Sequence, residues 1–370
     1  MSSINPTTAS VALARIRAHW RPILLITASI VLLSVFWYVS RYPQLLGYAA
    51  QEEYVVPSMA YSHQAMSVGA DAPMGLRIIA TTVNWLSSMK IGMTFGVLLG
   101  ALLHLTLRYY PLTVGTNLYL NALKGALVGV PGGVCANCAV PVACGVTRGN
   151  GRVEVALGFL FSSPNFNPVV VMMTFTALPL AMSLTKYIIL VFVILFLVPA
   201  LVRGLDRTPS WQQVVAREVP ASCVILSPPA GDGSERFTTV FRELARGYAE
   251  YVWMLLKPTI TLMLLAGVLA ATALVVVPWE ALLSQATPWR LAYVSLLSVF
   301  IPVPIAMDVM FAAQLQQQGV PAGYVMLFAM TLGTYSIIPS IYLWREVSKP
   351  LSAGLFGFFL VLGWIVGLVF

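Results

Sequence analysis

Nine apolar runs, each close to the length that crosses a bilayer, constrain this chain more than any other feature. A transmembrane helix needs ~20 predominantly apolar residues. With 59% hydrophobic and 9% charged residues, the chain cannot be an ordinary soluble globule, and we predict an all-α polytopic membrane protein. The runs cover roughly 22–39, 77–107, 112–130, 153–178, 184–202, 251–277, 290–313, 321–344 and 352–370.

The basic residues stand singly at the ends of these runs, although the formal net charge is +8. That distribution suits lipid headgroups and membrane topology, and it argues against a nucleic-acid partner. The first run follows Arg15, Arg17 and Arg21 and is too long and aromatic for a signal core. We therefore expect an uncleaved N-terminal span with a cytoplasmic N-terminus.

Nine crossings would place the arginine-rich segment 203–250 outside together with Arg148 and Arg152, against the positive-inside bias. Suppose instead that two runs are re-entrant, so that each enters the membrane and returns to the side it came from. These are the run that ends at Gly133 and the run that is interrupted at Pro302. The cations named above then become cytoplasmic. The topology then leaves four cations at the outer face: Arg41, Arg77, Lys186 and Arg290.

An internal similarity supports re-entrant segments. The chain aligns with itself without a gap at an offset of 169 residues. At this offset Val140–Ala143 aligns with Val309–Ala312, and Ser162–Asn167 aligns with Thr331–Ser336. Each half then consists of a span, a re-entrant hairpin, a broken helix and a span, and the halves start on opposite sides. This pattern predicts two inverted-topology repeats, an architecture of transporters. Chance similarity between apolar segments is the alternative.

The domain boundaries follow from this division. The Pro- and Gly-rich stretch Ser227–Ser234 and the lone Cys223 lie in a polar connector, and Arg242–Tyr251 is predicted to form a short helix that leads into the next span. We expect an N-terminal span with an outer loop at 1–75, a first membrane repeat at 76–202, a cytoplasmic linker at 203–250 and a second membrane repeat at 251–370.

The first hairpin carries a cysteine cluster with three open interpretations. Three thiols suit a soft metal ion, Cys-x-x-Cys spacing also serves thiol–disulfide chemistry, and cysteine can simply fill a small packing position. No other cofactor is expected. The candidate substrate contacts of this hairpin are Cys135, Asn137, Cys138, Pro141 and Cys144, and the tentative metal ligands are Cys135, Cys138 and Cys144.

A second candidate site is the segment that interrupts the run 153–178. Pro164 and Pro168 remove two backbone donors, and a half-helix N-terminus there would offer amides to a polarised solute. A plain proline kink is the alternative. The expected contacts are Ser162, Ser163, Pro164, Asn165 and Asn167, and the repeat shift adds Thr331, Gly333, Thr334 and Ser336.

Three ionisable residues within apolar runs are candidate coupling residues. Asp308 is a lone carboxylate that could carry a proton, and Lys90 and Lys124 are its candidate partners in a structural salt bridge. Snorkelling to the membrane surface is the alternative for Lys124. Glycines at every fourth residue predict close helix packing, namely Gly92, Gly96 and Gly100, and Gly125, Gly129 and Gly133.

From about Arg77 to Phe370, the chain resembles the YraQ/ArsP-type predicted permease family, which includes bacterial organoarsenical efflux permeases. Cys135 and Pro141 match the family's first hairpin, and Ser163-Pro164 with Asn167-Pro168 match its broken helix. The resemblance implies a bacterial inner-membrane permease that extrudes a small solute.

We therefore predict a non-enzymatic secondary transporter or exporter of a small molecule or ion, with a soft metalloid or metal ion among the candidate substrates. Its expected partners are the substrate and the bilayer, and a homo-oligomer is compatible with the sequence. The chain has no Gly-rich nucleotide-binding loop. The alternative is a membrane thiol-redox protein that relays electrons through Cys135 and Cys138. A non-catalytic assembly subunit is favoured if the Pro/Asn segments are fully packed.

Overall fold

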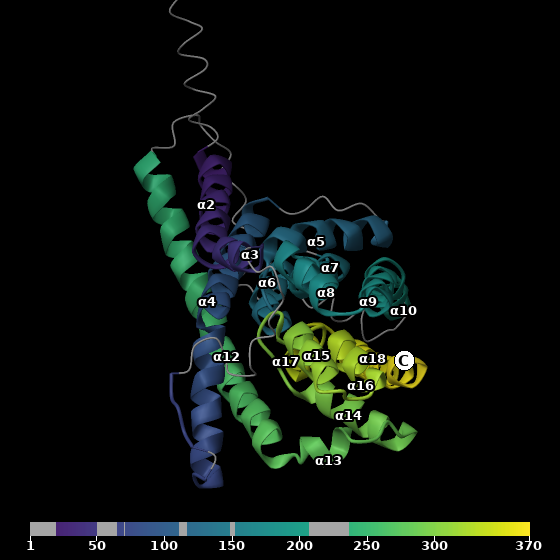
Figure 1. Ribbon diagram of the computed structural model, residues 1–370. Helices are drawn as coiled ribbons and strands as arrows, with labels where there is room; N and C mark the ends of the chain where they lie inside the picture. Colours follow the sequence, from purple (N-terminus) through teal and green to yellow (C-terminus); the bar gives the residue numbers. More distant parts are fainter. Residues whose placement is uncertain (1–19, 50–64, 70, 111–116, 149–151, 207–236) are drawn as a thin grey trace, which may run out of the picture.

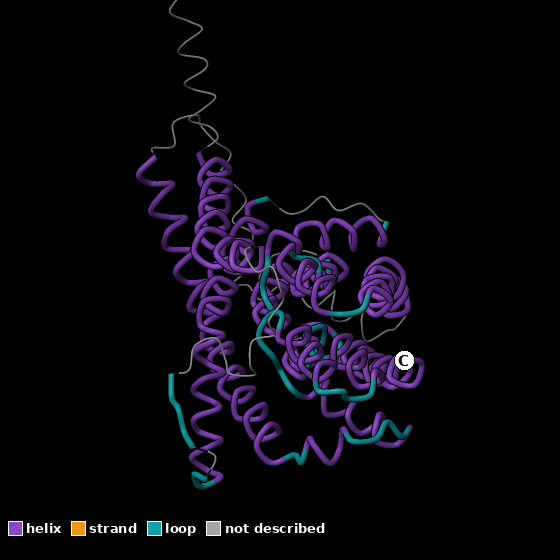
Figure 2. The backbone as a smooth tube through the Cα atoms, viewed as in Figure 1, coloured by secondary structure: helices purple, strands orange, loops and turns teal. Residues whose placement is uncertain are grey.

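The computed structural model describes residues 20–49, 65–69, 71–110, 117–148, 152–206 and 237–370. Within these ranges the regular structure is entirely helical (Figures 1 and 2). This confirms the predicted all-α class. Cys223 and Ser227–Ser234 lie outside the described residues.

Five helices in the described part of the chain are long and apolar enough to cross a membrane, judged by length and composition. The nine apolar runs therefore do not give nine continuous spanning helices. The five are α2 (Trp20–Phe36) with η1 (Trp37–Arg41), α4 (Met74–Tyr109), α9 (Leu180–Phe192) continued by η2 (Val193–Leu197) and α10 (Val198–Asp206), α12 (Phe237–Val276), and α18 (Lys349–Val369).

A sixth candidate span is a pair of helices bent by 48°. Helix α7 (Val153–Asn165) ends at the predicted interruption, and α8 (Pro168–Ala177) begins with Pro168 at its first position. Proline is favoured there because its missing N–H would have no partner within the helix. The predicted break in this run is thus present.

The remaining helices are shorter. Gly133 ends α5 with φ 55°, a left-handed conformation that glycine adopts without strain, and Ile301–Ala306 separates α14 from α15. Both interruptions lie where the sequence predicts them. The short helices are α3 (Tyr42–Ala49), α5 (Leu118–Gly132), α6 (Ala136–Arg148), α13 (Trp279–Leu283), α14 (Pro288–Phe300), α15 (Met307–Gln317), α16 (Ala322–Thr331), α17 (Ile337–Tyr342) and η4 (Leu343–Val347).

Helices α4 and α12 pack along each other and run in opposite directions (Figure 1). Gly247 near the start of α12 faces Leu105 near the end of α4, whereas Gly267 faces Trp85. Arg242–Tyr251 belongs to α12, so the helix predicted there continues directly into the long helix.

The glycine repeats permit close approach of helix backbones, as predicted. A Cβ atom at Gly96 would collide with the carbonyl oxygen of Cys138 on α6, and one at Gly100 with that of Pro141. On the neighbouring pair, a Cβ at Gly125 of α5 would collide with the carbonyl oxygen of Val155 on α7. Glycine therefore sets the spacing of α4 on α6 and of α5 on α7.

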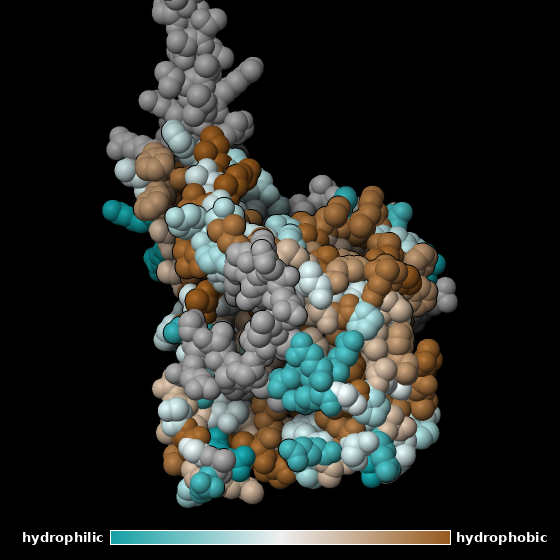
Figure 3. Space-filling view, viewed as in Figure 1, coloured by the Kyte–Doolittle hydropathy of each residue, from teal (hydrophilic) through white to brown (hydrophobic). Residues whose placement is uncertain are grey.

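The outer helix faces are apolar. On α2, Ile26 and Ile30 are 57% and 59% exposed, and on α9 Ile188 is 67% exposed. Figure 3 shows apolar surface over much of the visible face, including the region of α5 and α9. Such faces suit contact with lipid, because water would penalise exposure of so many large apolar side chains.

Candidate functional site

The two interrupted helices meet at their breaks. The hydroxyl of Thr334, between α16 and α17, donates to Asn165 Oδ1 at the end of α7 at 3.3 Å. Both side chains are buried. The contact joins two positions that differ by 169 residues, the offset found in the sequence.

The first hairpin reaches the same region through Asn137. Its Nδ2 donates to Val303 O at 3.2 Å, and its Oδ1 accepts from the Ser336 hydroxyl at 2.7 Å. One amide therefore connects the start of α6 with the Ile301–Ala306 segment and the start of α17. The structure brings together Asn137, Asn165, Thr334 and Ser336, all of them predicted site residues.

Asn167 forms hydrogen bonds with backbone groups on both sides of the break between α7 and α8. Its Nδ2 donates to Ser163 O at 3.2 Å and Pro164 O at 3.4 Å, while its Oδ1 accepts from Val170 N as the N-cap of α8. Pro168 has no N–H for the Pro164 carbonyl, so the side chain supplies the missing donor.

We expect Asn167→Ala to lower the free energy of unfolding by more than Asn117→Ala. Both residues are N-caps, a role worth about 0.5–2 kcal/mol, but Asn117 is exposed and bonds only backbone amides. Asn167→Ala also leaves buried carbonyls without their side-chain donor. Thermal unfolding of both variants in detergent measures the difference, and equal losses would contradict the role assigned to Asn167.

Ser162 and Ser163 fasten this break to α5. The Ser162 hydroxyl donates to Ala126 O at 2.8 Å, and Ser163 Oγ accepts from Val134 N at 3.1 Å. Thr331 bonds Leu327 O and Ser298 in the second half. Each of these three predicted contact residues is hydrogen-bonded within the protein.

A buried ion pair lies beside the breaks. Lys186 Nζ on α9 is 2.7 Å from Asp308 Oδ2 on α15, with side-chain exposures of 0% and 3%. Asp308 also packs on Gly333, where a Cβ would approach its carboxylate carbon to 2.5 Å. Ala306, whose φ of 65° is in the left-handed region, is the N-cap of α15, two residues before Asp308.

The partner of Asp308 differs from both sequence candidates. Lys90 and Lys124 are exposed on α4 and α5, whereas Lys186 is buried inside the protein. The sequence did contain a signal for this pair. Lys186 is a lone lysine in the apolar run 184–202, and a buried charge requires a partner of opposite charge. Its neighbour Tyr187, also missed, donates to Asn165 O at 3.2 Å.

Arg41 is also buried within the protein. Its Nε donates to Gly133 O at 2.6 Å, and Trp37 Nε1 donates to Pro131 O at 2.6 Å. These side chains satisfy carbonyls at the end of α5 that have no helical partner. The N-terminal helix thus holds the first hairpin.

The cysteine cluster does not form the three-thiol metal site. Cys135 and Cys138 are paired as a disulfide, whereas Cys144 lies further along α6. Among the described residues, no group of three His, Cys, Asp or Glu side chains is placed to hold a metal ion. Pro141, the remaining residue predicted there, packs through its carbonyl against Gly100.

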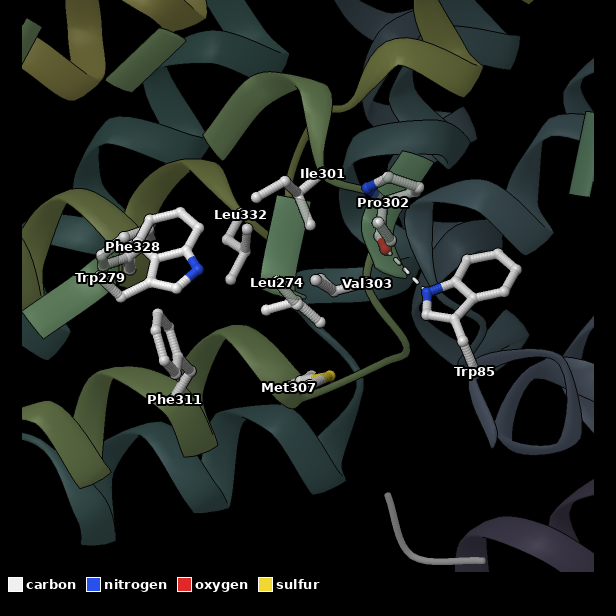
Figure 4. A pocket seen from close by; sticks show the side chains of 11 residues that line it. Trp85, Leu274, Trp279, Ile301, Pro302, Val303, Met307, Phe311, Phe328 and Leu332 are labelled. Carbon is white, nitrogen blue, oxygen red and sulfur yellow. Dashed lines mark hydrogen bonds between the residues drawn. The ribbon is translucent and has the colours of Figure 1, made fainter. Parts of the chain in front are cut away.

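A small apolar cavity adjoins the site (Figure 4). Trp85 and Trp279 lie on its opposite sides, with Leu274 and Val303 between them, and Trp85 Nε1 donates to Pro302 O at 2.9 Å. Val303 connects this cavity to the polar site because its carbonyl accepts from Asn137. Leu274 and Trp279 also line two larger clefts near Arg77 and Glu280.

Taken with the apolar helices, broken helices facing each other around a buried ion pair are typical of a multi-pass membrane permease. The chain belongs to the ArsP-type predicted permease family, whose sequence profile matches residues 94–370. It is also similar to UPF0718 protein YraQ of Escherichia coli (strain K12), with 24% identity over 204 residues. That match covers 54% of this chain and about half, 56%, of the relative. No solved structure matches the chain.

Proposed function

We propose that this permease is a secondary transporter in which two inverted halves enclose the path of a small solute. The single observation that carries the proposal is the buried Lys186–Asp308 pair, which joins the two halves beside both helix breaks. A buried pair is costly to desolvate and does little for stability, so its presence points to a role in transport.

The inverted repeat is supported by the order of the helices. Three helix N-caps of the first half have counterparts 169 residues later in the second: Arg152 and Pro321, Asn167 and Ser336, and Pro179 and Ser348. The packing is also reciprocal, because α6 contacts α17 while α15 contacts α8.

The orientation of the halves is supported by α4 and α12. Their starts, Met74 and Phe237, occupy corresponding places in the two halves, and the helices pack antiparallel. Two equivalent helices that run in opposite directions favour a two-fold axis in the membrane plane. We retain the divisions 1–75, 76–202, 203–250 and 251–370, except that α12 begins at Phe237 and so places residues 237–250 with the second half.

The ion pair breaks this symmetry. The positions equivalent to Lys186 and Asp308 are Leu355 and Ala139, both buried and apolar. A single charged pair, present on one side of the two-fold axis only, suits coupling of transport to an ion gradient. In this coupling the Asp308 carboxylate would release Lys186 and bind a proton instead. We place the protein in a bacterial inner membrane with a cytoplasmic N-terminus, and retain a soft metalloid or metal ion as its substrate class.

One observation favours a second candidate, a non-catalytic assembly subunit. Every residue of the segment Ser162–Asn167 except the partly buried Phe166 is buried, as such a role would allow. The same packing suits the closed state of a transporter. Membership of a predicted permease family favours a transporter over an assembly subunit. The thiol-redox alternative gains no support from the comparisons.

Transport into everted vesicles tests the proposal, with the solute chosen by growth of a deletion strain on arsenicals, copper, zinc and mercury. Thr334→Val and Asn165→Ala are expected to lower flux about tenfold, the equivalent of a ~1.4 kcal/mol hydrogen bond. Thr176→Val on exposed α8 surface is the matched control. Normal flux in Thr334→Val would contradict a path through the breaks, and absence of flux for every solute would favour the assembly role.

A further inference from the structure

We propose that Cys135, Cys138 and Met89, with the two cysteines reduced, form a three-coordinate site for a soft monovalent cation, Cu(I) or Ag(I). Met89 lies on α4, opposite the start of α6, and no sequence motif links it to the cysteines. As a transport site this assignment rests on the proposed function, whereas the binding itself does not.

The sulfur positions fit such an ion. Cys135 Sγ lies 3.7 Å and Cys138 Sγ 3.9 Å from Met89 Sδ. Metal–sulfur bonds of ~2.3 Å in a trigonal plane place the sulfurs about 4 Å apart, so two sides of the triangle already have suitable lengths. Reduction replaces the covalent S–S bond by a non-bonded contact, which opens the third side toward the same length.

The surroundings favour a monovalent ion. All three residues are buried, with exposures between 1% and 3%. No fourth ligand of the His, Cys, Asp or Glu type joins them in the described part of the chain, whereas structural Zn²⁺ sites are almost always tetrahedral. Thiolate and thioether ligands select Cu(I) among the common metals.

Two backbone features prepare the site. Cys138 N donates to Cys135 Sγ at 3.1 Å in the first turn of α6, which stabilises negative charge on that sulfur. Gly92 on α4 leaves room beside Cys138, where a Cβ would approach Sγ to 3.2 Å. The glycine repeat thus admits the sulfur cluster as well as the helix contact.

An added dithiol reduces the Cys135–Cys138 disulfide before the metal binds. The reductant gives two electrons and two protons to the disulfide and itself becomes a disulfide. Each thiol then releases its proton to solvent as its bond to the metal forms, and the metal keeps its oxidation state. Asn137, between the two cysteines, connects the loaded hairpin to Ser336 in the second half.

Metal titration of the purified full chain in detergent tests the site. In a Cys223→Ser background, the reduced protein is expected to bind one Cu(I), measured by competition with a chromogenic chelator, and the disulfide form none. Outer-shell changes alone shift metal affinity by roughly 10–100-fold, so Met89→Leu should weaken binding by at least about tenfold. Leucine has a similar volume and should preserve the fold.

X-ray absorption at the copper edge supplies the second readout. Three sulfur neighbours are expected in the parent and two in Met89→Leu, while Cys144→Ser, the matched control on α6, retains three. Absence of Cu(I) binding by reduced protein would overturn the proposal, as would three sulfurs in Met89→Leu or loss of binding in Cys144→Ser. Cu(I) binding without flux into vesicles would contradict only the role of the site in transport. Flux without Cu(I) binding would contradict only the proposed site and would leave the proposed function standing.

Discussion

Asp308→Asn is expected to abolish transport and to destabilise the protein by about 3–5 kcal/mol, the usual cost of removing one partner of a buried ion pair. Lys186, with no exposed side-chain surface, would lose the carboxylate that balances it. Flux into everted vesicles measures the loss of transport, and thermal unfolding in detergent measures the loss of stability.

A double variant separates stability from transport. Lys186→Met with Asp308→Leu removes both charges, and a well-packed apolar replacement of a buried pair is often neutral or stabilising. We expect its unfolding temperature to recover while flux remains absent. Lys90→Gln and Lys124→Gln, at exposed positions, are controls that should leave both measurements unchanged. Parent-like flux in Asp308→Asn would remove the carboxylate from the mechanism.

Gly96→Ala is expected to lower the free energy of unfolding by about 1–3 kcal/mol, the range for overpacking a close-packed interior. The added methyl group would meet the Cys138 carbonyl on α6, a backbone atom that cannot move without displacing the helix. The same shift would disturb the first hairpin, so flux should fall as well.

Gly354→Ala is the matched control for this prediction. It is an exposed glycine within α18 with nothing within 4 Å of an added Cβ. Alanine is a better helix former by up to ~1 kcal/mol, so this variant should be neutral or more stable. Opposite signs for the two variants would identify close packing as the cause, and equal effects would show that Gly96 acts only through helix propensity.

The membrane class and the interruptions of the helices could be predicted because both depend on local sequence. Apolar length decides whether a helix suits lipid, and proline and glycine decide where it ends, as at Pro168 and Gly133. The glycine repeat likewise predicted the contact of Gly96 with α6.

The partners of the polar groups could not be obtained this way. Lys186 and Asp308 are 122 residues apart, and Met89 is 46 residues from Cys135. For such residues the sequence indicates only that a buried charge or sulfur needs neighbours. It did not pair Asp308 with Lys186, and it grouped Cys144 with the other thiols, because spacing along the chain does not measure distance across packed helices.

The amino-acid sequence by itself thus determined that the chain enters a membrane as interrupted helices, since hydropathy and backbone restrictions act within one or two turns. Only the tertiary structure decided that Asn165 meets Thr334, that Asp308 pairs with Lys186, and that Met89 faces the cysteines. Those contacts depend on how separate helices cross, and crossing is set by the packing of many side chains at once.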